Sequence, residues 1–172
     1  GLLKSAIRDD NPCVFLEHKW IYRRIKEIVS DDPDHLVPIG KADVKREGTD
    51  VSVITHGMMV HLALEAAETL ATEGIAVEVL DLRTVQPLDE EAILGTVTRT
   101  SRAIVLSESQ RYLSTAAEVA SLIAEEAFES LDAPVVRLTP PHVPVPFSPP
   151  LEDAYLPQVS DIEDAVRKLS AW

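Results

Sequence analysis

Hydrophobic and polar residues follow their clearest pattern between positions 50 and 89 of the chain. Two apolar runs rich in Val and Ile, 51–55 and 75–82, have few polar interruptions, which is typical of strands covered on both faces. Between them, residues 58–73 have the i, i+3, i+4 spacing of one buried helix stripe, formed by Val60, Ala63, Leu64, Ala67, Leu70 and Ala71. Gly74 stops this helix. The pattern predicts a right-handed βαβ crossover.

The alternation of strand and helix patterns continues to the end of the chain. In chain order the predicted elements are a helix at 89–98 with Asp89 as N-cap, a strand at 103–106, a helix opened by a capping box at 115–118, a strand at 134–138, and a helix opened by a capping box at 160–163 and ending at 172. The proline-studded residues 139–150 are expected to form an extended surface segment. Strands that alternate with helices predict a three-layer α/β/α fold with a mostly parallel sheet.

The first 49 residues do not follow this pattern. Residues 1–7 read as the end of a helix, and residues 13–16 read as a short buried strand after a turn. A helix end and one strand cannot form a core alone, so we expect that the chain starts inside a domain whose earlier part is missing. Residues 18–49 are highly charged and have no sustained period, so we interpret them as an inter-domain linker without regular elements.

Composition narrows the class of protein. Hydrophobic residues make up 45% of the chain and charged residues 26%, which is normal for a soluble globular protein. No apolar run approaches the roughly 18 residues that a membrane span needs, and we expect a cytoplasmic protein. Cys13 is the single cysteine, which rules out an internal disulfide framework and a cysteine-built metal cluster. The net charge of −13 argues against a nucleic-acid partner and favours a basic protein partner.

Candidate chemistry is sparse. No glycine-rich phosphate loop follows the first predicted strand, and the five histidines include no pair at metal-ligand spacing. His56 lies at the carboxyl end of a predicted strand, where open sheets place ligands; the alternative is a polar residue that caps the next helix. Glu108 closes the strand at 103–106 and is expected in an interface, with a crevice as the alternative. These patterns alone indicate an acidic α/β domain that is part of something larger.

Several longer strings carry a resemblance to a known family over nearly the whole chain. They are Asn11-Pro-Cys-Val-Phe-Leu-Glu-His-Lys19, Thr55-His-Gly-Met-Met-Val-His61, Leu80-Asp-Leu-Arg-Thr-Val-Gln-Pro-Leu-Asp89, Ile123-Ala-Glu-Glu-Ala-Phe128 with Ala133-Pro134, and Pro144-Val-Pro-Phe147. The sequence resembles the beta subunit of thiamine-diphosphate-dependent 2-oxo acid dehydrogenases of the pyruvate, acetoin and branched-chain types. The resemblance implies the end of a pyrimidine-binding domain at 1–17, a linker at 18–49 and a transketolase C-terminal domain at 50–172.

The same resemblance implies a function and a set of cofactors. The complete protein would serve the oxidative decarboxylation of pyruvate or branched-chain 2-oxo acids, with acyl transfer to a lipoyl group. No position here matches the family's catalytic glutamate or histidine, so we expect no catalytic residue in this chain. Thiamine diphosphate and magnesium would be held by the complete assembly with the alpha subunit. The family's potassium site, built from main-chain carbonyls, maps onto Ala6, Ile7, Asp9 and Asn11; the alternative is an ordinary helix C-cap.

The implied partners are an alpha subunit, a second beta subunit and the subunit-binding domain of a lipoyl acyltransferase. We expect Phe147 in the contact between beta subunits; the alternative is a strap folded over the domain's own edge. We expect Trp172 and its carboxylate in the contact with the basic subunit-binding domain. Two other functions remain open, namely the C-terminal domain of transketolase or deoxyxylulose-phosphate synthase, and a stand-alone docking module. The sequence does not identify the oxo acid.

Overall fold

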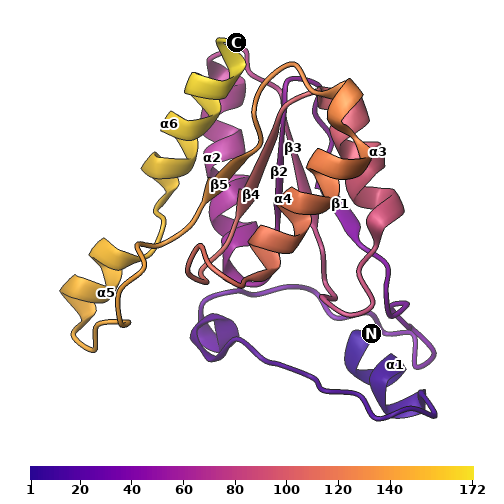
Figure 1. The fold of residues 1–172 in the computed structure, drawn as a ribbon. Coiled ribbons are helices and arrows are strands. Elements are labelled where there is room, and N and C mark those ends of the chain that lie inside the picture. Colours follow the sequence, from indigo (N-terminus) through magenta and orange to yellow (C-terminus); the bar gives the residue numbers. More distant parts are fainter.

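The computed structural model describes residues 1–172, and a five-stranded sheet forms its centre (Figure 1). The strand order is β1-β3-β2-β4-β5. The strands are β1 (Asp43–Arg46), β2 (Val51–Thr55), β3 (Val77–Asp81), β4 (Ala103–Leu106) and β5 (Val136–Leu138). β1 runs antiparallel to β3, and all other neighbouring strands are parallel. The predicted mostly parallel sheet is confirmed.

Two helical layers enclose this sheet. The helices are α1 (Leu2–Arg8), η1 (Lys19–Arg23), α2 (Met58–Thr72), α3 (Glu90–Thr100), α4 (Thr115–Glu126), η2 (Phe128–Ser130), α5 (Pro149–Tyr155) and α6 (Val159–Ser170). α2 and α6 share one buried cluster, with Leu70 and Ile162, whereas α3 and α4 share a second cluster, with Ile93 and Ile123. Figure 1 shows the sheet between these two layers, with α1 and α5 outside them. The predicted three-layer α/β/α architecture is confirmed. No helix of the chain combines the length and the apolar character that crossing a membrane requires.

The βαβ unit forms as the hydrophobic pattern predicts. β2 and β3 are parallel neighbours in register from Val51 opposite Val77 to Thr55 opposite Asp81. Every residue of β2 is buried, because helices cover both faces of the sheet. The buried residues of α2 are Met58, Met59, Val60, Ala63, Ala66, Ala67 and Leu70. Ala71 is exposed, which corrects the predicted stripe; the buried face is centred on Ala63, Ala66 and Leu70.

Residues 18–49 contain two regular elements, so the expectation of a linker without elements is wrong. β1 pairs antiparallel with β3 at the edge of the sheet, and η1 comes earlier in the chain. A search for hydrophobic runs does not find β1, because Val44 is its single apolar residue and its other three residues are charged. Charged side chains are tolerated there because β1 is an edge strand with one side open to solvent. The division of the chain into three segments stays a prediction.

The buried strand expected at 13–16 is also absent. This stretch is extended without ladder partners, and the side chains of Val14 and Leu16 are 88% and 85% exposed. A strand needs a neighbour to satisfy its backbone groups, and no other segment of this chain lies beside residues 13–16 as a strand. Apolar composition alone therefore misidentified the stretch.

Helix caps show where the sequence signals are accurate. Asp89 is the N-cap of α3, and its side chain accepts a hydrogen bond from Ala92 N–H. The other two capping boxes are displaced by one and two residues, since Ser114 caps α4 and Gln158 caps α6. Within the proline-studded segment, α5 begins with two prolines at its first two positions; their fixed φ and missing N–H suit a helix start.

Candidate functional site at the carboxyl edge of the sheet

Three polar side chains meet where parallel strands end. His56 follows β2, Asp81 ends β3, and Glu108 comes two residues after β4. The ladder register places Thr55, the residue before His56, directly opposite Asp81. In an open parallel sheet this edge is where ligands bind, because the loops there can separate and leave a crevice. The expectation of a ligand-type position for His56 therefore has a structural basis.

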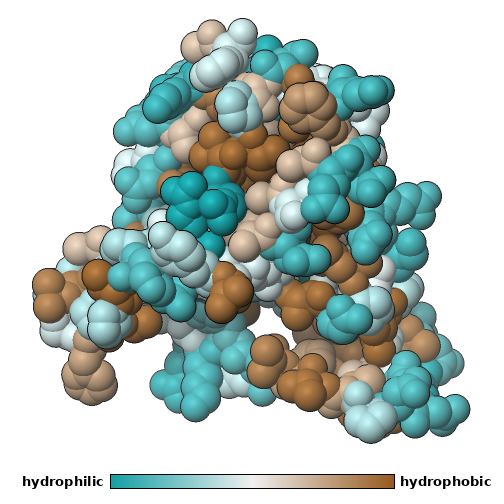
Figure 2. Space-filling model, viewed as in Figure 1, coloured by the Kyte–Doolittle hydropathy of each residue, from teal (hydrophilic) through white to brown (hydrophobic).

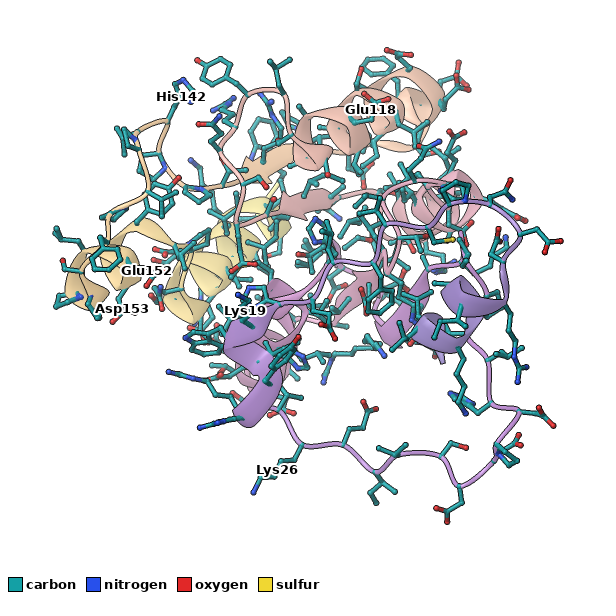
Figure 3. All side chains as sticks on the ribbon, turned by 90° about the horizontal axis from the view of Figure 1, so that it is seen from below. Lys19, Lys26, Glu118, His142, Glu152 and Asp153 are labelled. Atoms are coloured by element: carbon teal, nitrogen blue, oxygen red, sulfur yellow. The ribbon has the colours of Figure 1, made fainter.

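Glu108 lies at this edge and is hydrogen-bonded to a residue from far away in the sequence. His18 Nε2 lies 3.1 and 3.0 Å from the two carboxylate oxygens of Glu108. The side chains are 30% and 26% exposed, so both are half-buried. A carboxylate can only accept hydrogen bonds, so His18 donates through Nε2–H. Figure 3 looks onto this edge and labels Lys19 at the start of η1, directly after His18.

The ring of His56 lies in the same electrostatic environment. Burial lowers the pKa of His56 from its ordinary value of 6.5, and the nearby charges of Glu108 and Asp81 oppose this effect without cancelling it. The ring is therefore held mainly neutral near pH 7. The alternative of a helix cap is not realised, because Gly57 is the N-cap residue of α2 and no side chain caps that position.

A cavity of about 550 Å³ adjoins Glu108. Its lining comes from the loop after β4, the start of α4, the proline-rich segment and α5: Glu108, Ser109, Gln110, Tyr112, Leu113, Ser114, Thr115, Val143, Pro144, Val145 and Tyr155. The rings of Tyr112 and His142 meet edge to face, with centroids 4.7 Å apart. This contact ties the loop after β4 to the proline-rich segment. The cavity thus opens between two loops and not within the core.

The four residues predicted to hold potassium lie at the end of α1 and in the turn that follows. Ala6 and Ile7 are in the last turn of the helix, whose carbonyls have no partner within the helix. The Asp9 carboxylate accepts hydrogen bonds from the backbone N–H and side-chain amide of Asn11, at 2.8 and 2.9 Å. The Asn11 carbonyl accepts from the Cys13 thiol. Potassium binding by these carbonyls stays a prediction.

The two predicted docking residues are both on the surface, at different ends of the domain. Phe147 is 101% exposed and Trp172 is 68% exposed. In Figure 1, the C-terminus lies at the upper end of α6, and α5 lies beyond its lower end. Figure 2 shows hydrophobic surface gathered at the projecting α5 end. Phe147 is not covered by its own domain, as a strap would require. Its role in an interface, like that of Trp172, stays a prediction.

The residues of this edge do not fit a thiamine diphosphate and magnesium site. No group of three or more His, Cys, Asp or Glu side chains is placed to hold a metal ion. A methyl group at Gly57, the N-cap of α2, would lie 4.0 Å from a Glu108 oxygen. That carboxylate repels a diphosphate from the start of α2, where free backbone N–H groups would otherwise favour an anion. No step through the cofactor follows from these residues.

Sequence reasoning missed His18, which it placed in a linker. The residue pairs with Glu108 across 90 positions, and no local periodicity reports so distant a contact. The available signals were the charge of Glu108 at a strand end and the string Glu17-His18-Lys19. Neither identifies the other residue as its partner.

This architecture defines a class of protein: an open α/β domain with a mostly parallel sheet and its polar groups at the carboxyl edge. Residues 40–162 match the family described as "Transketolase, C-terminal domain". The chain belongs to this family, and the fold expected from the resemblance is confirmed.

Individual relatives agree with this family. The chain is 47% identical over 173 residues to the 2-oxoisovalerate dehydrogenase subunit beta of Bacillus subtilis, covering 100% of this chain and 53% of the relative. It is 48% identical to the pyruvate dehydrogenase E1 component subunit beta of the same organism, covering 98% and 51%. Among solved structures, a split gene transketolase in an inactive beta4 tetramer has a TM-score of 0.71 and 30% identity, covering 86% of this chain and 46% of that chain. The chain therefore spans about half the length of the curated relatives it matches.

Proposed function

We propose that this chain is the C-terminal part of the beta subunit of a 2-oxo acid dehydrogenase, in its decarboxylating first component. The supporting observation is the identity of 47–48% over nearly all of the chain to two beta subunits of that kind. The split gene transketolase reaches only 30%. In the complete protein the reaction would release carbon dioxide from a 2-oxo acid and pass the acyl group to a lipoyl group, with thiamine diphosphate as cofactor.

Within that protein, the part described by residues 1–172 would serve assembly. The alpha subunit is the first partner, because the relatives are named as beta subunits. A second beta subunit is the proposed partner of Phe147, and the subunit-binding domain of a lipoyl acyltransferase is the proposed partner of Trp172. Magnesium would be bound outside this chain, and potassium at the carbonyls of Ala6, Ile7, Asp9 and Asn11. Nearly equal identity to the 2-oxoisovalerate and pyruvate enzymes leaves both substrates as candidates.

A chimera tests this function directly. The matching segment of the Bacillus subtilis 2-oxoisovalerate dehydrogenase subunit beta is replaced by this chain, and the product is expressed together with its alpha subunit. We expect the chimera to co-purify with the alpha subunit and to release carbon dioxide from 2-oxoisovalerate or pyruvate. The corresponding segment of the split gene transketolase serves as the control, since it shares the fold at lower identity.

The control separates the fold from the specific subunit. We expect the transketolase segment to give a chimera that assembles poorly, because surfaces that contact other subunits diverge faster than a buried core. An assembled chimera with this chain that released no carbon dioxide from either oxo acid would contradict the proposal. If the two chimeras assembled equally well and were equally active, the result would support only the shared fold and not a beta-subunit role for this chain.

A further inference from the structure

The space between the carboxyl ends of β2 and β4, here called the crevice, is the topological switch point of the sheet. After β2 the chain crosses through α2 on one face and returns as β3, on one side of β2. After β4 it crosses through α4 on the other face and returns as β5, on the opposite side. The two loops therefore diverge, and the gap between them is the place where open α/β sheets bind their ligands.

The chain fills this gap with its own His18. The imidazole donates to both oxygens of Glu108 from the β4 side. On the β2 side, ring atom Cδ2 approaches Gly57, where an added methyl group would be 3.8 Å from it. The second ring nitrogen, Nδ1, is buried and has no hydrogen-bond partner. Only one of the two ring nitrogens of His18 is therefore hydrogen-bonded: Nε2 makes the polar contact, and the ring carbon Cδ2 packs near Gly57.

The groups around the crevice favour a nitrogen-heterocycle donor. Glu108 and Asp81 supply two carboxylates, and His56, the other ring, is held mainly neutral by burial. An anion would face both carboxylates, and an apolar group would leave Glu108 without its partner. An imidazole satisfies Glu108 through Nε2–H and places Cδ2 against Gly57, a residue that lacks a side chain. A ring that combines one N–H donor with an apolar edge therefore suits this position.

His18 is one of very few contacts that hold its segment to the domain. Between residues 9 and 36, only three side chains are even partly buried, namely His18, Ile21 and Ile25. Ile21 packs against the cluster formed by α2 and α6. On either side of them, Val14 and Ile28 are 88% and 97% exposed. Figure 3 shows Lys26 on the extended stretch that leads away from the sheet.

We propose that the crevice between β2 and β4 is a receptor site for an imidazole group, that His18 is its built-in ligand, and that this contact docks residues 9–36 onto the domain. The inference goes beyond the proposed function, because it concerns residues of this chain alone and needs no 2-oxo acid activity. A free imidazole molecule should enter the crevice when the His18 side chain is removed.

The test uses the full chain and trypsin. The docked segment carries four exposed cleavage positions, Lys19, Arg23, Arg24 and Lys26. His18→Gly should raise the rate of cleavage there by roughly tenfold, the factor expected when one hydrogen bond to a charged group is lost. Millimolar imidazole should then restore protection in a saturable manner. His142→Gly is the control: it removes an exposed histidine whose ring contacts Tyr112 in the loop after β4, and it should leave the rate unchanged if the His18–Glu108 contact itself docks the segment.

Glu108→Gln provides the second arm and remains informative if His18→Gly folds poorly. With His18 intact, this variant should also expose the segment to trypsin, because the acceptor loses its charge. Imidazole should give no protection in the double variant His18→Gly with Glu108→Gln. Unchanged cleavage in both single variants would overturn the docking role. Faster cleavage in His18→Gly that imidazole did not reverse would overturn the receptor site.

Discussion

The carboxylate of Asp89 accepts a hydrogen bond of 3.0 Å from the backbone N–H of Ala42, 47 residues earlier in the chain. The same carboxylate accepts from Ala92 N–H, 3.3 Å away, as the N-cap of α3. One buried side chain therefore fixes both the approach to β1 and the start of α3. Burial acts to raise the pKa of Asp89, but hydrogen bonds from Ala42 and Ala92 and the charge of Lys41 outweigh it and hold the pKa below 3.8.

Asp89→Ala should lower the free energy of unfolding by about 2 kcal/mol, because it removes a helix cap and leaves a second backbone donor without its acceptor. Urea denaturation followed by circular dichroism measures the change. Glu91→Ala, at an exposed position in the first turn of α3, is the control and should stay within about 0.5 kcal/mol. Since the pKa of Asp89 is lowered on folding, its contribution is present above pH 3.8 and is lost as the pH falls through the lower folded value. Similar losses of unfolding free energy in Asp89→Ala and Glu91→Ala would contradict the role of Asp89 as a shared acceptor for β1 and α3.

His56 should make the domain less stable in mild acid. Burial lowers the pKa of its imidazole below 6.5, so the unfolded chain takes up this proton more readily than the folded domain does. Stability should therefore fall as the pH drops below 6.5, toward the lower folded pKa. His56→Gln should flatten this part of the profile, measured as the urea midpoint between pH 7.5 and 5. His61→Gln, on the surface of α2, is the control and should retain the slope. A profile unchanged by His56→Gln would assign the acid sensitivity to other groups.

Phe147→Asp should weaken self-association more than it lowers the melting temperature. The ring is fully exposed in the single chain, so the substitution removes no internal contact. An aromatic residue at the centre of an interface usually costs more than 1 kcal/mol on truncation, so the dimer Kd should rise roughly tenfold. Sedimentation equilibrium measures the Kd, and Phe128→Asp, at another exposed aromatic position, is the control. An unchanged oligomer for Phe147→Asp would place the contact between copies of the chain elsewhere on the surface.

Removal of Ala171 and Trp172 should weaken binding of the acyltransferase subunit-binding domain roughly tenfold. The exposed indole would be lost and the C-terminal carboxylate would move back to Ser170, whereas α6 ends at Ser170 and keeps its buried face. Calorimetry at two salt concentrations measures the affinity, and the shortened chain should also show a weaker salt dependence. Self-association of the shortened chain is the control for an intact fold. Equal affinity and equal salt dependence would place the docking surface elsewhere.

The chain on its own should not decarboxylate pyruvate or 2-oxoisovalerate, even with thiamine diphosphate and magnesium. The charge of Glu108 lies beside the start of α2 and opposes diphosphate binding there, and the sequence has no glycine-rich phosphate loop. Release of labelled carbon dioxide measures the activity, with the chimera and its alpha subunit as the positive control. Cofactor-dependent release above background by the isolated chain would show a catalytic site within these residues.

Sequence patterns predicted the elements whose stabilising contacts are local or whose burial is uniform. The strand at 103–106 was located to the residue, since apolar side chains cover both of its faces. Asp89 was identified as a cap because its N–H partner lies three residues away. α5 was missed because prolines were taken as evidence against structure, although the first turn of a helix accepts them.

Contacts between distant segments could not be predicted in this way. β1 is stabilised by its ladder with β3 and not by its own composition, which is mostly charged. The polar edge was located through His56 and Glu108, each at a strand end. Its organising residue, His18, lies in a segment without periodicity and finds Glu108 only through the tertiary fold. The family resemblance located the domain but not this contact.

The outer strands of the sheet are poor templates for another chain. β1 has four residues, three of them charged, and its pairing is irregular between Val44 and Arg46. β5 has three residues, and Pro140 and Pro141, which lack a backbone N–H, follow soon after it. Short, charged or proline-flanked edges discourage the open-ended stacking of strands that produces fibrils. Copies of this domain at high concentration should therefore meet through side-chain surfaces and form assemblies of limited size.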